Sequence, residues 1–523
     1  MFGNNDSLRL STTIIMDDPN DRGFPTSRTP RFRIPSRFSN GAIVAIFLVL
    51  SVIYAGFLIT RGVSYASSSD ASGYFNSAQL LANAAVSTPI KTIPHFTPTD
   101  GDYYYQQPLG FSVVNETISL VPTYPPGLPL HLLIAAQVVG WDHAAILVNV
   151  LGAFLSGWLT FLLARKYCHL SPAWALAATL LLWTCPLFVF FSLQPMSDMP
   201  STGWCLLAFF SALNARQRVI WGLLAGVAVG IAVLLRPTNL FVMLPVLIIL
   251  RGSWKAWGYL ILGGLPFAVI QIAYNLKTYG EILTTGYGDV STLLQSEFVA
   301  HNSIHFAQWI PRLLTPAIIL AGAIPWLLDY YPRLISAMIA WIVALITFYT
   351  FYYHAGETWW YLRFILPVFP FLILAALMVG QRLAEFIRNP WLRAILPLAI
   401  LGTALSSQYH MNSQLDVTHV KPGDRAYFDT NEWLLNNVSD DAIIVAMQAS
   451  GSLHYYTEYP LVRYDVISPE KLALVFESAR QHGQPIYAPL FPFEIEAVVT
   501  AKLGGNWEQV ATIGYITIWK LKG

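Results

Sequence analysis

Long apolar segments separated by short polar ones make up most of this chain. A helix needs about 20 mostly apolar residues to cross a bilayer, so the pattern predicts an α-helical polytopic membrane protein with about eleven transmembrane helices. The runs 199–214 and 239–250 are shorter than that, which leaves their limits open. The apolar runs lie at 41–60, 144–164, 172–192, 199–214, 219–236, 239–250, 256–274, 314–329, 334–353, 362–380 and 391–409.

Residues 411–523 have a different pattern, in which short β-type segments alternate with amphipathic ones. Ser468-Pro469-Glu470 is a good helix start and Gly483 a good stop. The segment predicts a small α/β domain for support or acceptor recognition, because it holds no Ser-His-Asp order, P-loop or metal motif. The expected strands are 442–448, 460–465, 485–490, 507–513 and 515–521, and the expected helices are 429–438, 468–482 and 493–503.

Two further segments complete the predicted organisation. Residues 1–40 are polar and rich in Pro, Ser and Arg, which indicates a disordered tail. The transmembrane domain then covers 41–410 and contains a large loop, 61–143. Early in that loop, Ser68 and Ser69 are candidate helix caps. Tyr74, Ala78 and Leu81 then share one helical face, which predicts a helix lying in the membrane interface before a turn-rich return to the membrane.

Composition agrees with the membrane class. Hydrophobic residues make up 55% of the 523 residues and charged residues only 11%, with a mean hydropathy of +0.50. The net charge of +1 gives no sign of a nucleic-acid partner. The three cysteines lie in apolar runs without metal-ligand spacing, which favours buried small hydrophobes.

The basic residues predict the orientation. They fall in alternate short loops, as expected of cytoplasmic loops. The N-terminus is therefore expected in the cytoplasm, and the loop 61–143, the segment 275–313 and the C-terminus outside a plasma or inner membrane. Within 275–313, residues 279–280 and 284–288 are expected to form loop. The basic loop residues are Arg165, Lys166, Arg216, Arg218, Arg251, Lys255, Arg333, Arg382, Arg388 and Arg393.

Four charged residues are expected together at the outer rim. Ionisable groups at membrane depth are costly and usually mark function or a buried pair. The topology places Asp198, Arg236 and Arg363 on the same side as Asp70. Arginines suit phosphate oxygens, and a carboxylate suits deprotonating a hydroxyl or holding a cation. A cavity with an acidic and a basic wall, open to the outer leaflet, fits this set.

Several segments, in this order, carry a resemblance to a known family. The chain resembles polyprenyl-phosphate-dependent glycosyltransferases of the GT-C superfamily, in the branch that includes protein O-mannosyltransferases and lipid A aminoarabinose transferases. The resemblance covers nearly the whole chain after residue 40. Its segments are SSDASGYFNSAQLLA around Asp70, YPPGLPL (124–130), QPMSDMPS around Asp198, LLRPTNLFVMLP (234–245), the stretch from Asn275 to TTGYG (284–288), YLRFILPVFP (361–370) and the α/β tail.

The resemblance implies a function in the cell envelope. It implies inverting transfer of a sugar from a polyprenyl-phosphate donor to an extracytoplasmic acceptor hydroxyl on a glycan, lipid or protein. Asp70 takes the place of the catalytic carboxylate and Asp198 that of a second active-site acid. Arg236 and Arg363 are the candidates for the donor phosphate. The residues expected to line the substrate cavity are Tyr74, Tyr124, Tyr287, Glu357 and Tyr361.

Other interpretations remain open at this stage. Ala71 follows Asp70 where protein O-mannosyltransferases typically carry an adjacent Asp-Glu pair, which counts against that branch. A transporter, a glycan ligase and a membrane scaffold are the alternative functions. No metal ligands are assigned, although a divalent cation at the Asp70/Asp198 site stays open. His301 and His305 have ligand spacing on a helix but no third ligand.

Overall fold

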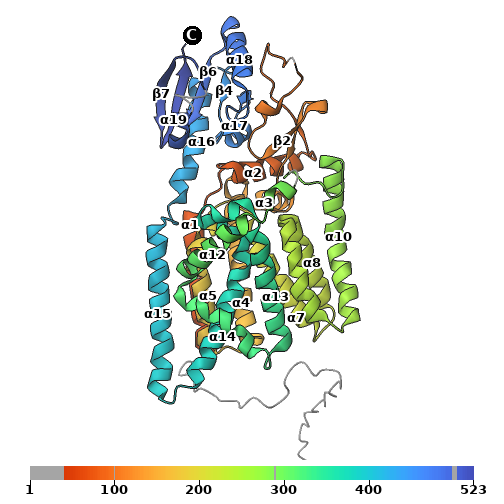
Figure 1. Cartoon of the computed structure of the whole chain (residues 1–523), viewed down its shortest axis with the longest axis vertical. Coiled ribbons are helices and arrows are strands. Elements are labelled where there is room, and N and C mark those ends of the chain that lie inside the picture. The colour runs from red at the N-terminus through yellow and green to blue at the C-terminus, as the bar shows by residue number, and fades with distance from the viewer. Residues whose placement is uncertain (1–39, 99, 288–289, 498–502, 523) are drawn as a thin grey trace, which may run out of the picture.

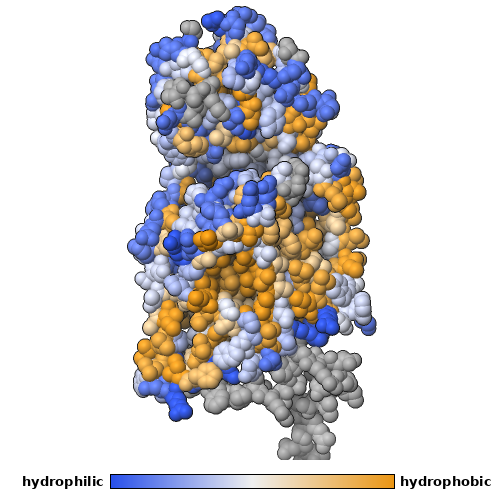
Figure 2. Space-filling model, in the orientation of Figure 1, coloured by the Kyte–Doolittle hydropathy of each residue, from blue (hydrophilic) through white to orange (hydrophobic). Residues whose placement is uncertain are grey.

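The computed structural model describes residues 40–98, 100–287, 290–497 and 503–522. It consists of a helical bundle and, at one end of that bundle, a region that contains strands (Figure 1). The predicted disordered tail lies outside the described residues, apart from Asn40. Apolar side chains cover much of the bundle, and hydrophilic ones gather over the strand-containing region (Figure 2). We call the end with the strands the domain-bearing end.

The bundle follows the predicted apolar runs closely. Its helices are α1 (Asn40–Arg61), α4 (Trp141–Lys166), α5 (Pro172–Trp183), α6 (Pro186–Ser192), α7 (Asp198–Ala215), α8 (Trp221–Leu235), η3 (Pro237–Val242), α9 (Met243–Leu250), α10 (Trp254–Tyr279), α12 (Phe298–Leu314), η4 (Pro316–Leu327), α13 (Pro332–Thr350), η6 (Trp359–Val368), α14 (Phe369–Glu385) and α15 (Pro390–Gln414). The short pieces α11 (Val290–Leu293) and η5 (Tyr353–Gly356) lie between them.

Proline explains where several runs break. Pro186 begins α6 after a bend of 62° from α5, and Pro316 begins η4 after a bend of 106° from α12. Both prolines stand at the first position of a new helix, where the missing N–H removes no internal hydrogen bond. Helix α12 was not among the predicted elements. Tyr279 ends α10, and the predicted loop residues 280 and 284–287 do lie outside the helices, whereas residue 288 lies outside the described residues.

The length and composition of the helices identify fewer membrane-spanning helices than the sequence pattern predicts. Among the described residues, six helices are long and apolar enough to cross a membrane, or up to eight if each bent pair is one span. Shorter apolar helices, such as Trp221–Leu235, fall below that length. The multi-pass class is supported, and the number of about eleven stays a prediction.

The predicted cytoplasmic loops meet at the end of the bundle opposite the strands. Lys166 donates a hydrogen bond to Asn214, and Arg216 Nη1 donates to the carbonyl of Arg251 at 3.2 Å. Arg382 Nη2 donates to Tyr330 Oη at 3.3 Å. These loops come from five separate parts of the chain, so their meeting agrees with the alternation of basic loops. We call this the basic end.

Helix α2 (Ser69–Ala82) forms where a helix was expected, but its surroundings differ. Residues Ala71 to Ala78 are all buried, and Asn76 Nδ2 donates to the carbonyl of Gly451 at 3.0 Å. The prediction of an interfacial amphipathic helix is therefore wrong, because the C-terminal region covers the polar side. Ser68 is the cap residue, but its side chain makes no capping hydrogen bond.

The rest of the first loop is more ordered than expected. Strands β1 (Thr88–Pro89), β2 (Phe111–Val114) and β3 (Ser119–Pro122) form an antiparallel sheet in the order β1-β3-β2. Two single 3₁₀ turns, η1 (Tyr104–Gln106) and η2 (Asn115–Thr117), lie between strands. Helix α3 (Gly127–Val139) then leads into α4. Strands of two to four residues are too short to show a two-residue periodicity, so the sequence pattern missed them.

The C-terminal region agrees with most of the predicted elements. Its sheet has the order β5-β4-β6-β8-β7, with β4 parallel to β5 and β6, and β8 antiparallel to β6 and β7. Ser468 Oγ accepts from the backbone N–H of Lys471 at 3.3 Å and so caps α18, as expected. Helix α17 was not predicted. The elements are α16 (Val420–Asn437), β4 (Ile443–Val445), α17 (Ser450–Tyr456), β5 (Leu461–Val462), α18 (Pro469–Gln481), β6 (Ile486–Leu490), α19 (Pro492–Ala497), β7 (Trp507–Ile513) and β8 (Ile516–Leu521).

The first loop and the C-terminal region are joined by partly buried polar contacts. Lys91 Nζ donates to the carbonyls of His454 at 3.0 Å and Thr457 at 2.5 Å. The backbone N–H of Leu109 donates to Ser450 Oγ at 3.0 Å. Helix α2 is therefore held between the bundle and α17.

A first prediction concerns Gly451, where α17 contacts α2. A Cβ at Gly451 would lie 2.2 Å from Ser72 Oγ and 2.7 Å from the Leu109 carbonyl oxygen. Gly451→Ala should therefore lower the free energy of unfolding by about 1–3 kcal/mol through overpacking. The measurement is the thermal unfolding midpoint of the purified full chain. The control is Gly423→Ala in α16, where the nearest neighbour of a Cβ is Tyr515 Oη at 3.7 Å. Equal midpoints for the two variants would contradict the tight packing.

Candidate functional site

The four charged residues predicted at the rim form two ion pairs at the domain-bearing end. Arg363 Nη2 lies 2.6 Å from Asp70 Oδ2, and Arg236 Nη2 lies 2.7 Å from Asp198 Oδ1. Asp70 is in the first turn of α2, Asp198 begins α7, Arg236 follows α8 and Arg363 is in η6. The structure thus brings together charges from four separate elements.

Local sequence explains why these residues stand at helix ends. Asp70 and Asp198 lie in the first turns of their helices, where the macrodipole favours negative charge. Arg236 follows the C-terminus of α8, where positive charge is favoured. The residue before a proline avoids the helical region, and Arg236, before Pro237, has an extended backbone (φ −151°, ψ 119°) that ends α8.

Ser197 links the Arg236 pair to α2 and was missed by the sequence analysis. Its Oγ accepts hydrogen bonds from Arg236 Nε at 2.9 Å and from Tyr74 Oη at 3.1 Å. Ser197 and Asp198 are both fully buried. The signal available in the sequence was only its place beside Asp198. Tyr74, expected in the cavity wall, is therefore a hydrogen-bond partner within the charged cluster.

Asp70 is held by two strong donors. Tyr124 Oη donates to Oδ1 at 2.6 Å and Arg363 Nη2 donates to Oδ2 at 2.6 Å. Burial alone would raise the pKa of Asp70, but the Arg363 charge and these two hydrogen bonds together lower it below its usual value. The side chain of Asp70 keeps 21% of its surface exposed, so this carboxylate is ionised and partly accessible.

The tyrosines around Asp70 stay neutral. Burial, reinforced by the Asp70 charge, raises the pKa of Tyr124 well above its usual value and that of Tyr74 to about 12. The two rings lie 4.9 Å apart, and Tyr287 meets Tyr124 edge-on at 6.2 Å. Tyr124 and Tyr287 thus lie beside the charged cluster, and their place in the wall of a substrate cavity stays a prediction.

Aromatic rings also surround the guanidinium groups. Phe364 lies 5.2 Å from the Arg363 guanidinium and 5.5 Å from that of Arg236. Tyr361 lies 5.8 Å from Arg363 and Phe191 5.7 Å from it. Cation–π contacts of this kind favour a charged guanidinium in an apolar setting. Tyr361 was expected here, whereas Phe364 and Phe191 were not singled out.

Glu357 lies apart from the two ion pairs. Its Oε1 is 2.5 Å from His354 Nδ1, and its side chain is 46% exposed. The His354 ring stacks on Tyr361 at 5.1 Å, which links Glu357 to the cluster only through two intervening rings. Glu357 is therefore at the edge of the site.

The histidines with ligand spacing have a structural role. His301 Nε2 lies 3.0 Å from the Gly356 carbonyl oxygen, and His305 Nε2 lies 3.1 Å from that of Thr358. Both rings thus hold the loop that leads to Arg363. Within the described residues there is no group of three or more His, Cys, Asp or Glu side chains arranged to hold a metal. Asp70 and Asp198 are each paired with an arginine, so this donor set does not fit a divalent cation as arranged.

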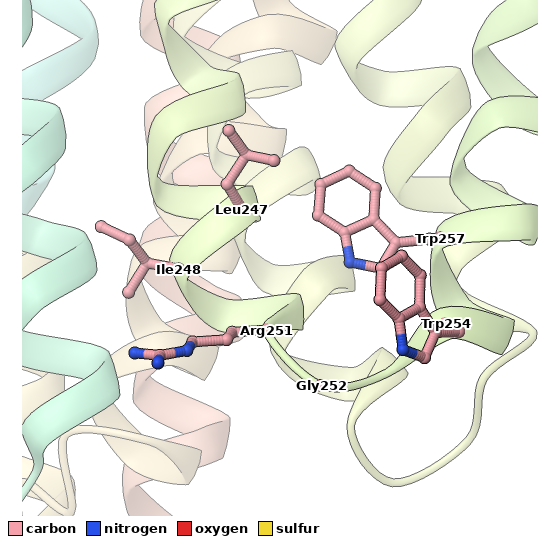
Figure 3. Close-up of a pocket in the computed structure, with 6 residues that line it drawn as sticks. All are labelled: Leu247, Ile248, Arg251, Gly252, Trp254 and Trp257. Atoms are coloured by element: carbon pink, nitrogen blue, oxygen red, sulfur yellow. The ribbon is translucent and has the colours of Figure 1, made fainter.

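A separate pocket of about 530 Å³ lies at the basic end. It is lined by Leu247, Ile248, Arg251, Gly252, Trp254 and Trp257, between α9 and α10 (Figure 3). Figure 3 shows Arg251 pointing away from the two indole rings. The lining is mostly apolar and Trp254 is 87% exposed, as expected of aromatic residues at a membrane interface. This pocket shares no residue with the charged cluster.

Part of the sequence is similar to a known protein family. Residues 124–273 match the family of dolichyl-phosphate-mannose-protein mannosyltransferases. This segment holds Tyr124, Asp198 and Arg236 but neither Asp70 nor Arg363. No curated protein sequence matches the chain.

Solved structures match over nearly the whole chain. ArnT from Cupriavidus metallidurans bound to undecaprenyl phosphate has a TM-score of 0.57 at 14% identity, covering 91% of this chain and 97% of ArnT. The oligosaccharyltransferase AglB from Archaeoglobus fulgidus, in complex with an inhibitory peptide and a dolichol-phosphate, has a TM-score of 0.53 at 12% identity, covering 87% and 70%. The arabinofuranosyltransferase AftD from Mycobacteria (mutant R1389S, class 2) has 0.50 at 12%, covering 92% of this chain and 41% of AftD. The resemblance to GT-C glycosyltransferases is confirmed at the level of fold.

A second prediction tests the buried ion pair. Asp198→Asn leaves the Arg236 charge buried without its counter-ion, which should cost about 3 kcal/mol of unfolding free energy. The control is Asp429→Asn, which breaks the exposed i,i+4 pair with Arg425 and should cost far less, because solvent screens that pair. The measurement is the thermal unfolding midpoint of the full chain in detergent, which should be lower for Asp198→Asn than for Asp429→Asn.

The double variant Asp198→Asn/Arg236→Gln should lose less stability than the two single losses added together, because no charge is left unpaired. Two results would show that Asp198 and Arg236 do not act as a buried pair. One is a stability loss in the double variant equal to the sum of the two single losses, and the other is an unfolding midpoint of Asp198→Asn equal to that of Asp429→Asn.

Proposed function

We propose that this protein is a membrane glycosyltransferase that moves a sugar from a polyprenyl-phosphate donor to an acceptor hydroxyl. The observation that carries the proposal is the meeting of two arginines and two carboxylates at one end of an apolar helical bundle. The guanidiniums suit a lipid-borne phosphate, and a carboxylate beside them suits an acceptor hydroxyl.

The position of the cluster supports a lipid-linked donor. A polyprenyl chain stays in the bilayer and keeps its phosphate near the membrane surface. Arg236 and Arg363 stand at the ends of apolar segments, a position that suits a phosphate near the membrane surface. Polyprenyl phosphates are bound in the structures of ArnT and AglB, which have this fold.

The proposed reaction is a single inverting displacement. The acceptor oxygen attacks the anomeric carbon of the sugar and forms the new glycosidic bond. The bond from that carbon to the phosphate oxygen breaks, and its electron pair goes to the departing polyprenyl phosphate. Asp70 accepts the acceptor's hydroxyl proton, and an arginine stabilises the growing charge of the phosphate.

Sidedness is part of the proposal. We infer that the basic end faces the cytoplasm and the domain-bearing end faces outward, with about eleven spans between them. The C-terminal region then lies over α2, where it would contact the acceptor. The acceptor is a glycan, lipid or protein hydroxyl on that side.

The charged cluster does not favour the alternative functions. A secondary transporter is expected to place its polar site near the middle of the membrane, whereas these charges lie at helix ends. A glycan ligase is expected to carry its large outer loop late in the chain, whereas here the long loop precedes α3.

A third prediction concerns Asp70 in turnover. Asp70→Asn keeps the shape of the side chain but cannot accept the proton, so sugar transfer should fall by about 100-fold or more. The assay measures free polyprenyl phosphate released in membranes from a panel of sugar-charged donors. Glu116→Gln, an exposed acid in the same loop, is the control and should retain full activity. Wild-type turnover in Asp70→Asn at equal expression would remove Asp70 from the reaction.

A further inference from the structure

The two ion pairs differ in how accessible their carboxylates are. Asp198 has 0% of its side chain exposed, whereas Asp70 has 21%. Asp70 is therefore partly open to solvent, whereas Asp198 is enclosed by its neighbours. The two acids are thus not equivalent, which agrees with the different roles that the resemblance implies for them.

The two arginines differ in how fully their donors are used. Arg236 donates through Nε to Ser197 and pairs through Nη2 with Asp198. Arg363 donates through Nη2 to Asp70, and its Nη1 donates to the thioether sulfur of Met196 at 3.7 Å. Its Nε is buried and has no hydrogen-bond partner among the residues that the structure describes. A thioether is a weak acceptor, so Arg363 has unsatisfied donors.

An arginine whose N–H donors lack strong acceptors can bind an anion that has several oxygens. A guanidinium presents five N–H groups in a planar fork that matches phosphate geometry. The rings of Phe191, Tyr361 and Phe364 lie within 5.8 Å of the guanidinium and favour its positive charge. A phosphate that took the Nε/Nη2 edge as a two-point partner would satisfy the open Nε and would displace Asp70 from Nη2.

We propose that Arg363 binds the donor phosphate and gives up its ion pair with Asp70 when it does so. Arg236 stays bound to Asp198 and Ser197 and acts as a positioning residue. This inference rests on the proposed function. It divides the roles of the four charges: Arg363 and Asp70 meet the substrates, and Asp198, Arg236 and Ser197 hold the surrounding frame.

The exchange connects donor binding to the chemistry at Asp70. In the resting state the Arg363 charge lowers the pKa of this carboxylate, which makes it a weak base. When Arg363 moves to the phosphate, burial remains and part of the stabilising charge is lost, so the basicity of Asp70 increases. Asp70 and the phosphate thus compete for one guanidinium, and competition is reciprocal.

The test is equilibrium binding of undecaprenyl phosphate and dolichyl phosphate to the purified full chain. Asp70→Asn removes the competing charge, so it should bind one of these lipids more tightly than wild type, by about fivefold or more. Arg363→Gln should lose at least about tenfold in affinity, the value of one charge-assisted hydrogen bond. The double variant Asp70→Asn/Arg363→Gln should bind the lipid with the same affinity as Arg363→Gln, because it has no guanidinium at this position for which Asp70 could compete. Glu116→Gln should match wild type.

The outcomes separate the exchange from the proposed function. Binding by wild type without any gain in Asp70→Asn overturns the exchange and leaves the transferase proposal standing. Failure of folded wild type to bind either lipid overturns both.

A second measurement needs no variant. A structure of wild type with undecaprenyl phosphate should show phosphate oxygens on Arg363 and an Asp70–Arg363 separation beyond ion-pair distance. An intact pair with the phosphate on Arg236 overturns the exchange.

Discussion

Charged groups at the edge of an apolar bundle must be neutralised, and this constraint organises the site. An isolated charge away from water costs far more than one that is paired and hydrogen-bonded. Here each carboxylate is paired with its own arginine, and a tyrosine is hydrogen-bonded to each pair. Tyr124 donates to Asp70, and Tyr74 donates to Ser197, which also accepts from Arg236. The pairs join α2 to η6 and α7 to the end of α8, so the electrostatic requirement also fixes how these elements meet.

The position of Asp70 depends on contacts on both sides of α2. The bundle holds one side of the helix through Tyr74 and Ser197, and α17 holds the other through Asn76 and the carbonyl of Gly451. Lys91 then joins the first loop to the same C-terminal region. A carboxylate carried by a flexible loop would not keep a 2.6 Å ion pair, so the C-terminal region contributes to the site without supplying a charge to it.

Much of the fold could be predicted from the sequence because the signals are local. Apolar runs, prolines at helix starts and basic residues in alternate loops depend on neighbours a few residues apart. The C-terminal strands and the cap at Ser468 were predicted for the same reason. The signals failed where elements are very short, as in β1 to β3, or where burial by a distant segment overrides amphipathicity, as in α2.

The sequence by itself determined which chemistry is present: an apolar multi-pass chain with two acids and two arginines predicted at one end. Only the tertiary structure decided which charge meets which, since Asp70 and Arg363 are 293 residues apart. It also showed Ser197 as the link between Arg236 and Tyr74, and left Glu357 at the edge. The physical reason is that pairing depends on distances of a few ångströms between elements, which helical periodicity and composition do not encode.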